Sequence, residues 1–276
     1  TIDYTCSSTQ ISGMSKNAFE SYLFKDGKPM ALTSLNKSDE APFQYGHLSL
    51  KAILAVRDKR LAQTIDTVLL YNGRGFTRFN TGMESTSSTG YGVAKYDNEA
   101  IPEGFRSQSG KNYTHAPLFW LSVIYLNYAE ACAELGNITQ DDLDKSINLL
   151  KDRAGLPHLN PIVGFSDPAN NHGVSDLIWE IRRERRCELM FDNDNRYWDL
   201  IRWHQLDKLD TTKYPDIILG ANVANDMDGC EANKVGKYID GSKDGSRIYD
   251  KKHYLYPIPT GQIALNPQLA PNNPGW

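Results

Sequence analysis

The clearest hydrophobic pattern lies in the middle of the chain, where apolar and aromatic residues recur at alternating spacings of three and four. The row consists of Leu118, Leu121, Tyr125, Tyr128, Cys132 and Leu135. This spacing predicts an amphipathic helix whose buried face is that row. Gly136 and Asn137 predict the end of the helix.

A second helix is predicted directly after this turn. Thr139 can cap it, with Asp142 three residues further on, in a variant of the capping box. Its buried face would consist of Leu143, Ile147, Leu150 and Ala154. Gly155 and Pro157 predict its end. Two helices joined so closely have the size of a tetratricopeptide-type hairpin, which needs neighbouring helices to cover its apolar face.

A third predicted helix is dense in charge. Ser175 and Asp176 indicate its start, and we expect it to run past Phe191. Its apolar side would carry Ile178, Ile181, Leu189 and Phe191. Four arginines and three glutamates stand between Glu180 and Glu188, and a local excess of one positive charge gives little support to phosphate binding. We therefore interpret these charges as arginine forks that hold carboxylates in a structural role.

The remaining sequence predicts short elements between long loops. Residues 17–24 and 50–61 have helical composition, residues 64–71 indicate a strand, and residues 197–206 could continue the helical layer. The proline-rich tail, residues 266–276, is expected to avoid helical structure and to dock on the helices as an extended strap.

These elements predict a mostly α-helical fold of tetratricopeptide-like hairpins with long, loop-rich insertions. We expect residues 1–276 to form a single domain. Within it, residues 1–110 are loop-rich, residues 111–206 form the helical core, and residues 207–276 supply loops and the C-terminal strap.

Composition narrows the class of protein further. Hydrophobic residues make up 40% of the chain and aromatic residues 11%, which is enough for a substantial core. The net charge of −4 argues against nucleic acid or an anionic membrane as the main partner. No apolar run reaches the roughly 20 residues of a membrane span. Residues 1–6 lack the features of a signal peptide or a lipid-attachment site, so we expect the signal and the anchor to be missing from this chain.

The four cysteines, Cys6, Cys132, Cys187 and Cys230, are far apart in the sequence. They form no C-x-x-C pair and have no histidine at metal-ligand spacing, so we expect no zinc site and no other cofactor. Cys132 and Cys187 fall in predicted helices and are expected to be buried thiols. Cys6 and Cys230 fall in predicted loops and could pair in an oxidising compartment.

Several blocks along the chain together resemble the C-terminal half of the SusD/RagB family of surface lipoproteins of Bacteroidetes. The blocks are Lys25 to Pro29, Arg57 to Leu61, Gly90-Tyr91 with Lys95-Tyr96, Tyr125 to Ala131, Arg153 to Pro157, Glu184 to Trp203, Tyr256 to Pro259, and Asn273 to Trp276. They follow one another in the order typical of the family. Three positions depart from the family pattern: Lys59 replaces a usual proline, residues 192–195 are longer than usual, and Trp276 replaces a terminal tyrosine. Family members are nearly twice as long, so the chain resembles a truncated or processed fragment.

This resemblance implies a fold, a place and a partner. The fold would be a helical scaffold decorated by long loops, and the place would be the outer face of the outer membrane, reached through a lipid anchor. The partner would be a SusC-like TonB-dependent transporter, and the ligand a nutrient glycan or, as in RagB-like proteins, a peptide. Ligand sites of the family lie in variable loops, so the recognisable blocks do not transfer as binding residues.

Two predicted loops combine aromatic and polar side chains in the way that sugar-binding surfaces do. The candidate ligand-binding residues are Phe43, Tyr45, Tyr71, Asn72, Arg74, Phe76, Arg78 and Phe79. Gly73 and Gly75 would let the backbone approach a ligand closely. The alternative is that Phe76 and Phe79 fold inward and anchor a long loop.

Two other classes of function compete with binding. A glycosidase would need two carboxylates, and the pairs Glu130 with Glu134 and Glu184 with Glu188 have helical spacing, but each pair has neighbours that explain it structurally. The sequence has no nucleophile, zinc-protease or phosphate-loop motif, so we expect no enzyme activity.

A pure protein-interaction module is the third hypothesis. An uncovered apolar face would also cause self-association or marginal stability.

Overall fold

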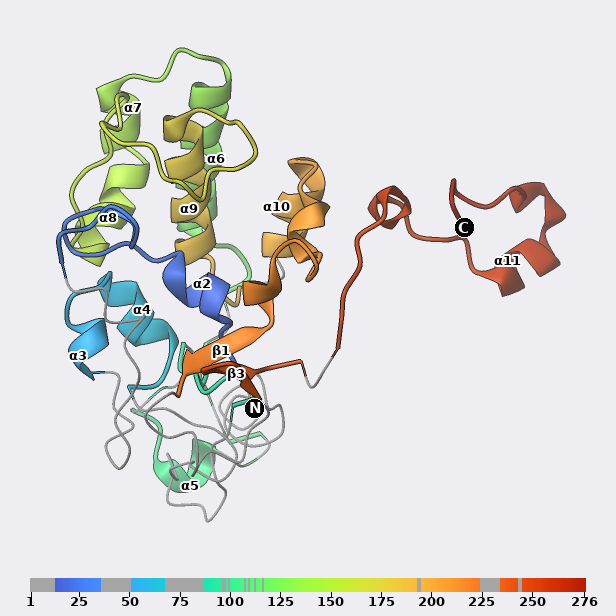
Figure 1. The fold of residues 1–276 in the computed structure, drawn as a ribbon, viewed down its shortest axis with the longest axis horizontal. Helices are drawn as coiled ribbons and strands as arrows, with labels where there is room; N and C mark the ends of the chain where they lie inside the picture. The colour runs from blue at the N-terminus through green and yellow to red at the C-terminus, as the bar shows by residue number, and fades with distance from the viewer. Residues whose placement is uncertain are drawn as a thin grey trace.

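Helices are the main regular structure in the part of the chain that the structure describes, and strands are few (Figure 1). The computed structural model describes residues 13–35, 51–67, 87–95, 98, 100–106, 108, 110–111, 113–115, 117–192, 195–223, 234–242 and 245–276. The mostly helical fold predicted from the sequence is confirmed.

The elements follow one another along the chain with short connections between the central helices. The α-helices are α2 (Lys16–Glu20), α3 (Lys51–Leu54), α4 (Lys59–Thr64), α5 (Glu103–Arg106), α6 (Leu121–Glu134), α7 (Gln140–Asp144), α8 (Ile147–Ala154), α9 (Asp176–Glu188), α10 (Asn195–Arg202) and α11 (Thr260–Leu265). The 3₁₀ turns are η2 (Leu206–Leu209), η3 (Pro215–Ile217), η5 (Lys251–Tyr254) and η6 (Pro267–Leu269), and the strands are β1 (Leu219–Asn222), β2 (Lys234–Val235) and β3 (Tyr238–Asp240).

The central helices pack around one apolar core. Helices α6 and α9 lie side by side, α8 packs against both, and α7 contacts α6 (Figure 1). Fully buried side chains from three helices meet there, among them Leu126 and Ala129 of α6, Ile147 of α8 and Ile181 of α9. Burying such side chains stabilises the fold by about 1.5 to 3 kcal/mol each, with alanine contributing less.

Several helix ends lie where the sequence predicts them. The Thr139 side chain and Asp142 form the reciprocal capping box at the start of α7, and the Ser175 hydroxyl accepts the backbone N–H of Ile178 at the start of α9. Gly155 ends α8 in the left-handed conformation, with φ of 69°. The predicted second helix is interrupted between α7 and α8, yet its predicted face, from Leu143 to Ala154, is buried.

The buried face predicted for α6 is mostly wrong, although Tyr125 of that row packs against the core. Leu118 precedes the helix and is 84% exposed, and Leu121 and Leu135 are 63% and 75% exposed. The buried side carries Leu126 and Ala129 instead, because α8 and α9 contact that side. The outward row also contains Ile124, Tyr128 and, before the helix, Phe119. We refer to these exposed residues, Leu118, Phe119, Leu121, Ile124, Tyr128 and Leu135, as the α6 outer row.

Helix α9 ends earlier than predicted. It stops at Glu188, and Phe191 lies beyond it with a φ of 64°, a conformation that cannot continue a right-handed helix. Lys95 explains the stop, because its Nζ donates to the carbonyls of Glu188 at 3.1 Å and Met190 at 2.8 Å. These carbonyls would otherwise lack partners at a helix end.

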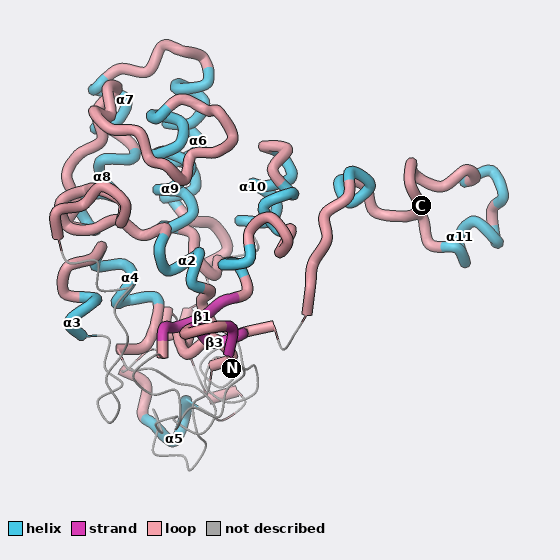
Figure 2. Tube along the Cα trace, in the orientation of Figure 1, coloured by secondary structure: helices cyan, strands magenta, loops and turns pink. Residues whose placement is uncertain are grey.

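A second core lies where the small sheet meets α2 and α4 (Figure 2). The antiparallel sheet has the strand order β1-β3-β2. The ring of Phe19 from α2 stacks on Tyr91, with centroids 4.4 Å apart and both side chains buried. Gly220 of β1 lies so close to the Thr89 backbone that a Cβ atom there would approach it to 2.2 Å. Loop 87–95 is thereby fixed between the sheet and the helices.

The elements predicted between residues 50 and 71 are only partly correct. Asp58 divides the predicted helix into α3 and α4 because its carboxylate caps α4, accepting the backbone N–H of Arg60. The first part of the predicted strand is wrong, because Thr64 belongs to α4 and Ile65 makes only an isolated bridge to Val93. Residues 68–71 lie outside the described part of the chain.

The C-terminal segment differs from the expected extended strap. Within the expected strap, residues 266–276, η6 forms a 3₁₀ turn at Pro267–Leu269, and η5 and α11 precede it. Figure 1 draws the segment around α11 beside the main body rather than along the central helices. Its tail folds back on itself, since the indole N–H of Trp276 donates to the Leu255 carbonyl at 2.8 Å. It meets the body through tyrosines, with the hydroxyls of Tyr256 and Tyr197 2.9 Å apart.

Candidate functional site

The aromatic loops predicted to bind a ligand cannot be placed in the structure. All eight candidate residues, Phe43, Tyr45, Tyr71, Asn72, Arg74, Phe76, Arg78 and Phe79, lie outside the described residues. The site that follows is built from other residues, which lie around helix α9.

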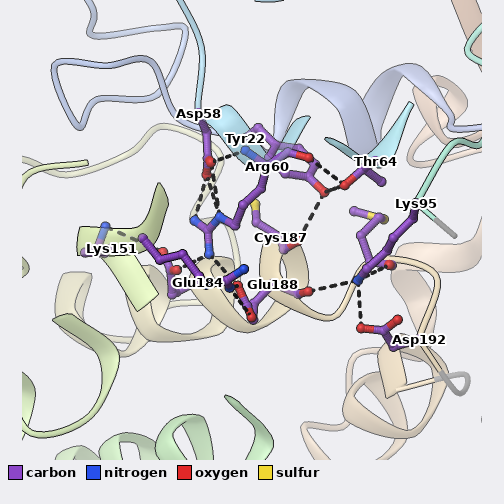
Figure 3. Close-up of polar contacts among 12 residues, drawn as sticks. Tyr22, Asp58, Arg60, Thr64, Lys95, Lys151, Glu184, Cys187, Glu188 and Asp192 are labelled. Carbon is purple, nitrogen blue, oxygen red and sulfur yellow. Dashed lines mark hydrogen bonds and ion pairs between the residues drawn. The ribbon is translucent and has the colours of Figure 1, made fainter. Parts of the chain in front are cut away.

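Arg60 is the centre of a buried ion network on one side of α9 (Figure 3). Its guanidinium reaches both oxygens of Asp58, with a shortest distance of 2.6 Å. The opposite edge of the guanidinium bonds Glu184 and, at 3.0 Å, Glu188. Lys151 of α8 approaches Glu184 from the other side at 3.6 Å. One arginine of α4 therefore joins three carboxylates across two helices.

Electrostatic pairing keeps this network ionised although it is buried. Burial alone would raise the pKa of Glu184, but the charges of Arg60 and Lys151 outweigh it and lower that pKa below its usual value. Burial likewise opposes the charge of Arg60, and its carboxylate neighbours raise its pKa well above the usual range. Glu188 is bound further by the exposed Arg153 at 2.5 Å.

The thiol beside this network is chemically inert. Cys187 is buried, and burial raises the pKa of its thiol to about 12. The Tyr22 hydroxyl donates to the Cys187 carbonyl at 3.1 Å, so the backbone carbonyl of this residue is also hydrogen-bonded. A nucleophilic cysteine needs a lowered pKa and access to solvent, and Cys187 has neither.

A second group of ion pairs joins α9 and α6 to α10. Arg185 places its Nε between the oxygens of Asp199, at 2.9 and 2.7 Å. Glu130 of α6 accepts a two-pronged contact from Arg202 at 2.9 and 2.6 Å, and the Trp203 indole N–H at 2.6 Å. Burial acts to raise the pKa of Glu130, but Arg202 outweighs it and lowers that pKa. These contacts explain the density of Glu and Arg in the sequence.

The two carboxylate pairs considered for glycosidase chemistry are thus occupied by cations. Glu134, the partner of Glu130, accepts from Arg182 at 3.1 Å, and both Glu184 and Glu188 contact Arg60. A general acid must hold a proton near neutral pH, and guanidinium contacts disfavour that form. Within the described residues, no group of three or more His, Cys, Asp and Glu side chains could hold a metal ion.

A cavity of about 610 Å³ lies on the other side of α9. Helices α2, α9 and α10, the turns η2 and η3, and the segment 167–171 surround it. Two tryptophans lie at its walls, and cations stack on both. The guanidinium of Arg182 lies 4.5 Å from the Trp203 ring, and Lys208 Nζ lies 4.7 Å from the Trp179 ring.

Charges of opposite sign meet at one end of this cavity. Arg183 is buried and pairs with Asp167 and, at 3.1 Å, with Glu180. The indole N–H of Trp179 donates to the same Asp167 at 3.1 Å. Burial raises the pKa of Glu180, whereas Asp167 keeps a lowered pKa because Arg183 outweighs the effect of burial. Asp167 is therefore an anion at neutral pH.

The sequence did not predict this cavity. The count of charges along α9 alone gives one excess positive charge, but the structure adds Arg196 from α10 and Lys208 from η2 to the same space. Neither residue belongs to a periodic pattern. The sequence feature that could have indicated the cavity is the group of four arginines between Glu180 and Glu188, because Arg182, Arg183 and Arg186 line it.

In the described part of the chain, no helix is both long enough and apolar enough to cross a membrane. No curated protein matches this chain. A model of the SusD family, however, matches residues 6–276.

Two solved structures share the fold. One is a SusD-like protein from Bacteroides fragilis, at 22% identity and a TM-score of 0.56, where the match covers 96% of this chain and 47% of the other. The other is the protein BT4246, at 24% identity and a TM-score of 0.61, with 95% and 46% covered. The chain thus spans about half the length of these two proteins.

Proposed function

The chain belongs to the SusD family, and on this premise we propose that it is a nutrient-binding protein of the outer membrane whose ligand is a glycan. The observation that carries the proposal is the family match over residues 6–276, which includes every sequence block that resembles the family. In this proposal, the protein captures an oligosaccharide or polysaccharide at the cell surface and passes it to a SusC-like TonB-dependent transporter. A lipid anchor in the full-length protein would hold it at the membrane.

The proposed ligand contacts are the two aromatic loops predicted from the sequence. Tyrosine and phenylalanine rings can stack on sugar faces, and Asn72, Arg74 and Arg78 can bond to hydroxyl groups. Phe76 and Phe79 carry the largest expected share because both stand in the same short segment as these polar residues. A peptide could occupy the same loops, since aromatic and guanidinium groups also bind peptides.

Binding without catalysis is the favoured form of this function. The candidate acid and base carboxylates are held by arginines: Glu130 by Arg202, and both Glu184 and Glu188 by Arg60. A glycosidase needs carboxylates about 5 to 9 Å apart that face one substrate and exchange protons with it. Carboxylates bound to buried guanidinium groups are poor candidates for that role.

The test is a panel of immobilised glycans and peptides, presented to the full chain and to the double variant Phe76→Ala/Phe79→Ala. We expect a glycan to bind the wild type, and we expect the variant to lose that binding by about tenfold, since stacking contributes about 0.5 to 1.5 kcal/mol per ring. Phe119→Ala is the matched control, because Phe119 is 93% exposed and lies outside the two loops.

Three outcomes would contradict the proposal in different ways. Selective binding of peptides would replace the glycan by a peptide ligand. Release of shorter sugars from a bound glycan would show an enzyme instead of a binding protein. Equal losses of glycan affinity in Phe119→Ala and in the double variant would show that the glycan does not bind at the 71–79 loop.

A further inference from the structure

The cavity between α2, α9 and α10 carries more positive than negative charge. Its cationic lining consists of Arg182, Arg183, Arg186, Arg196, Lys208 and Arg247. Its anionic lining consists of Glu20, Asp167 and Asp216. The excess of three positive charges results from six cations and three anions, and most of it lies on the wall built by α9, α10 and η2.

Some of these charges are neutralised by neighbours. Arg183 pairs with Asp167, and Arg182 contacts Glu134 at 3.1 Å. Glu20 pairs with Lys16, one turn earlier on α2.

Three cations have no such partner. Within the described residues, no carboxylate forms an ion pair with Arg186, Arg196 or Lys208. Arg186 donates instead to the neutral side-chain oxygen of Asn17 at 2.7 Å, and Asn17 in turn donates to Asp216 at 2.6 Å. Arg196 lies 5.9 Å from the Trp203 ring and Lys208 lies 4.7 Å from the Trp179 ring, while Asp199 and Asp207 act on these two cations without forming an ion pair with them.

Burial and mutual repulsion act on these three groups together. Burial and the nearby Arg186 lower the pKa of Arg196 to about 9. Burial, with Arg196 and Arg186, lowers the pKa of Lys208 to about 7. Like charges enclosed together disfavour ionisation, and a bound anion would relieve that strain.

An arginine of the cavity wall also has a hydrogen-bond donor without an acceptor. The Nε of Arg183 is buried and has no hydrogen-bond partner among the described residues, whereas the Nε of Arg182 lies 4.0 Å from a carboxylate oxygen of Glu130. Arg183 is only 8% exposed, so water reaches it poorly. A buried donor without a partner costs about 1 to 3 kcal/mol. A ligand with several acceptor oxygens would satisfy donors and charges at once.

We propose that this cavity is a binding site for a small oxyanion ligand with at least two negative charges, such as a polycarboxylate or a phosphate-bearing molecule. Its volume of about 610 Å³ lies within the range of small-molecule sites. Arg186 and Arg196 offer planar guanidinium groups that match carboxylate and phosphate oxygens, and Lys208 of η2 adds a point charge. This site is separate from the aromatic loops and does not depend on the proposed nutrient function.

The first test is calorimetric titration of the full chain with citrate, inorganic phosphate and, as a neutral probe, glucose. We expect citrate or phosphate to bind and glucose to give no heat from this cavity. A preference for citrate assigns the site to carboxylates, and a preference for phosphate assigns it to phosphate groups. Failure of both anions to bind would overturn the proposal.

Two variants and one control locate the binding. Arg196→Gln and Lys208→Gln each remove one unpaired cation, and each should weaken anion binding about tenfold. Lys213→Gln is the matched control for Lys208→Gln, because Lys213 is an exposed lysine five residues further on that does not line the cavity. Thermal unfolding of each variant verifies that it folds. Unchanged affinity in folded Arg196→Gln and Lys208→Gln would overturn the proposal.

Proton uptake by the protein during anion binding distinguishes a binding role of Lys208 from a structural one. The charged groups that face Lys208 are Asp207 of its own turn, Arg196 of α10, and Arg182 and Arg186 of α9. A bound anion would raise the pKa of Lys208 from about 7, so slightly above neutral pH the complex should take up protons that the free protein lacks. The titration enthalpy should then depend on the ionisation enthalpy of the buffer, and this dependence should vanish in Lys208→Gln.

Discussion

Helices α6 and α9 lie side by side, yet they reverse the usual relation between polarity and burial. In α9, which is rich in charge, Glu180, Arg183, Glu184 and Arg185 are buried. In α6, which is mostly apolar, Leu121 and Ile124 are more than 60% exposed. A ranking of the two helices by hydrophobicity alone would assign the deeper position to α6.

The neighbours of each helix explain the difference. The charges of α9 meet opposite charges from other elements, such as Arg60 of α4, Lys151 of α8 and Asp199 of α10. Leu121 and Ile124 of the α6 outer row are exposed and Tyr128 donates its hydroxyl to Asp142 of α7 at 2.6 Å, whereas the inner side of α6 packs against α8 and α9. The comparison teaches that burial in this protein depends on whether a side chain finds a suitable partner, and not on its polarity alone.

The largest effect is expected from removing the central partner of α9. Arg60→Met should lower the free energy of unfolding by about 3 to 5 kcal/mol, because it leaves the buried carboxylate of Asp58 without its cation and Glu184 with Lys151 alone. Urea denaturation measures this loss. Arg153→Gln is the control, since Arg153 contacts the same network but its side chain is 56% exposed, and it should cost at most about 1 kcal/mol. Equal losses in the two variants would refute the special role of buried pairing.

A smaller effect, with a characteristic pH dependence, is expected at Lys208. The pKa of Lys208 is about 7 in the folded protein, below the ordinary value of 10.5. At any pH where Lys208 is protonated in the unfolded chain, folding must either bury its charge or release its proton, and both lower the free energy of unfolding. Lys208→Met should therefore raise the free energy of unfolding below about pH 7, and the advantage should shrink as the pH rises toward 10.5. Urea denaturation at several pH values measures this. Lys213→Met, the exposed control, should show no such trend, and a pH-independent gain in Lys208→Met would contradict the assignment.

The smallest change in stability is expected in the α6 outer row. Leu121→Ser/Ile124→Ser should alter the free energy of unfolding by no more than about 0.5 kcal/mol per site, because both side chains are exposed. The double variant should nevertheless reduce self-association, which sedimentation measures, because it removes part of an exposed apolar face. The contrasting control is Leu126→Ala on the inner side, with an expected loss of about 2 to 5 kcal/mol. A large loss in the serine variant would mean that the outer row is covered.

The sequence predicts local features of this fold better than contacts between distant elements. The caps at Thr139 and Ser175 and the stop at Gly155 depend on a few neighbouring residues, and all three are confirmed. The buried side of α6 depends on where α8 and α9 lie, and the early end of α9 depends on Lys95, far away in the chain. The repeat of apolar residues could indicate a helix but not which side of it would be covered.

The cavity shows the same limit for the candidate site. Arg186, Arg196 and Lys208 come from three elements, and only their meeting creates an excess of positive charge. Counting charges along one helix could not predict it. The aromatic loops remain a prediction from residue types, since Phe76, Phe79 and their neighbours lie outside the described residues.

The attachment of α9 to the early part of the chain has a consequence for the order of folding. Lys95 and Arg60 bond to partners on or just beyond α9 that lie 93 and 124 residues later, so these contacts close long loops of the chain. Such closures form late, because a large loss of chain entropy precedes any gain from them. Until Arg60 packs against α9, Glu184 and Glu188 stay hydrated and have no desolvation cost. Before its partners pack against it, the α9 segment therefore exposes charged side chains to water, and this disfavours aggregation.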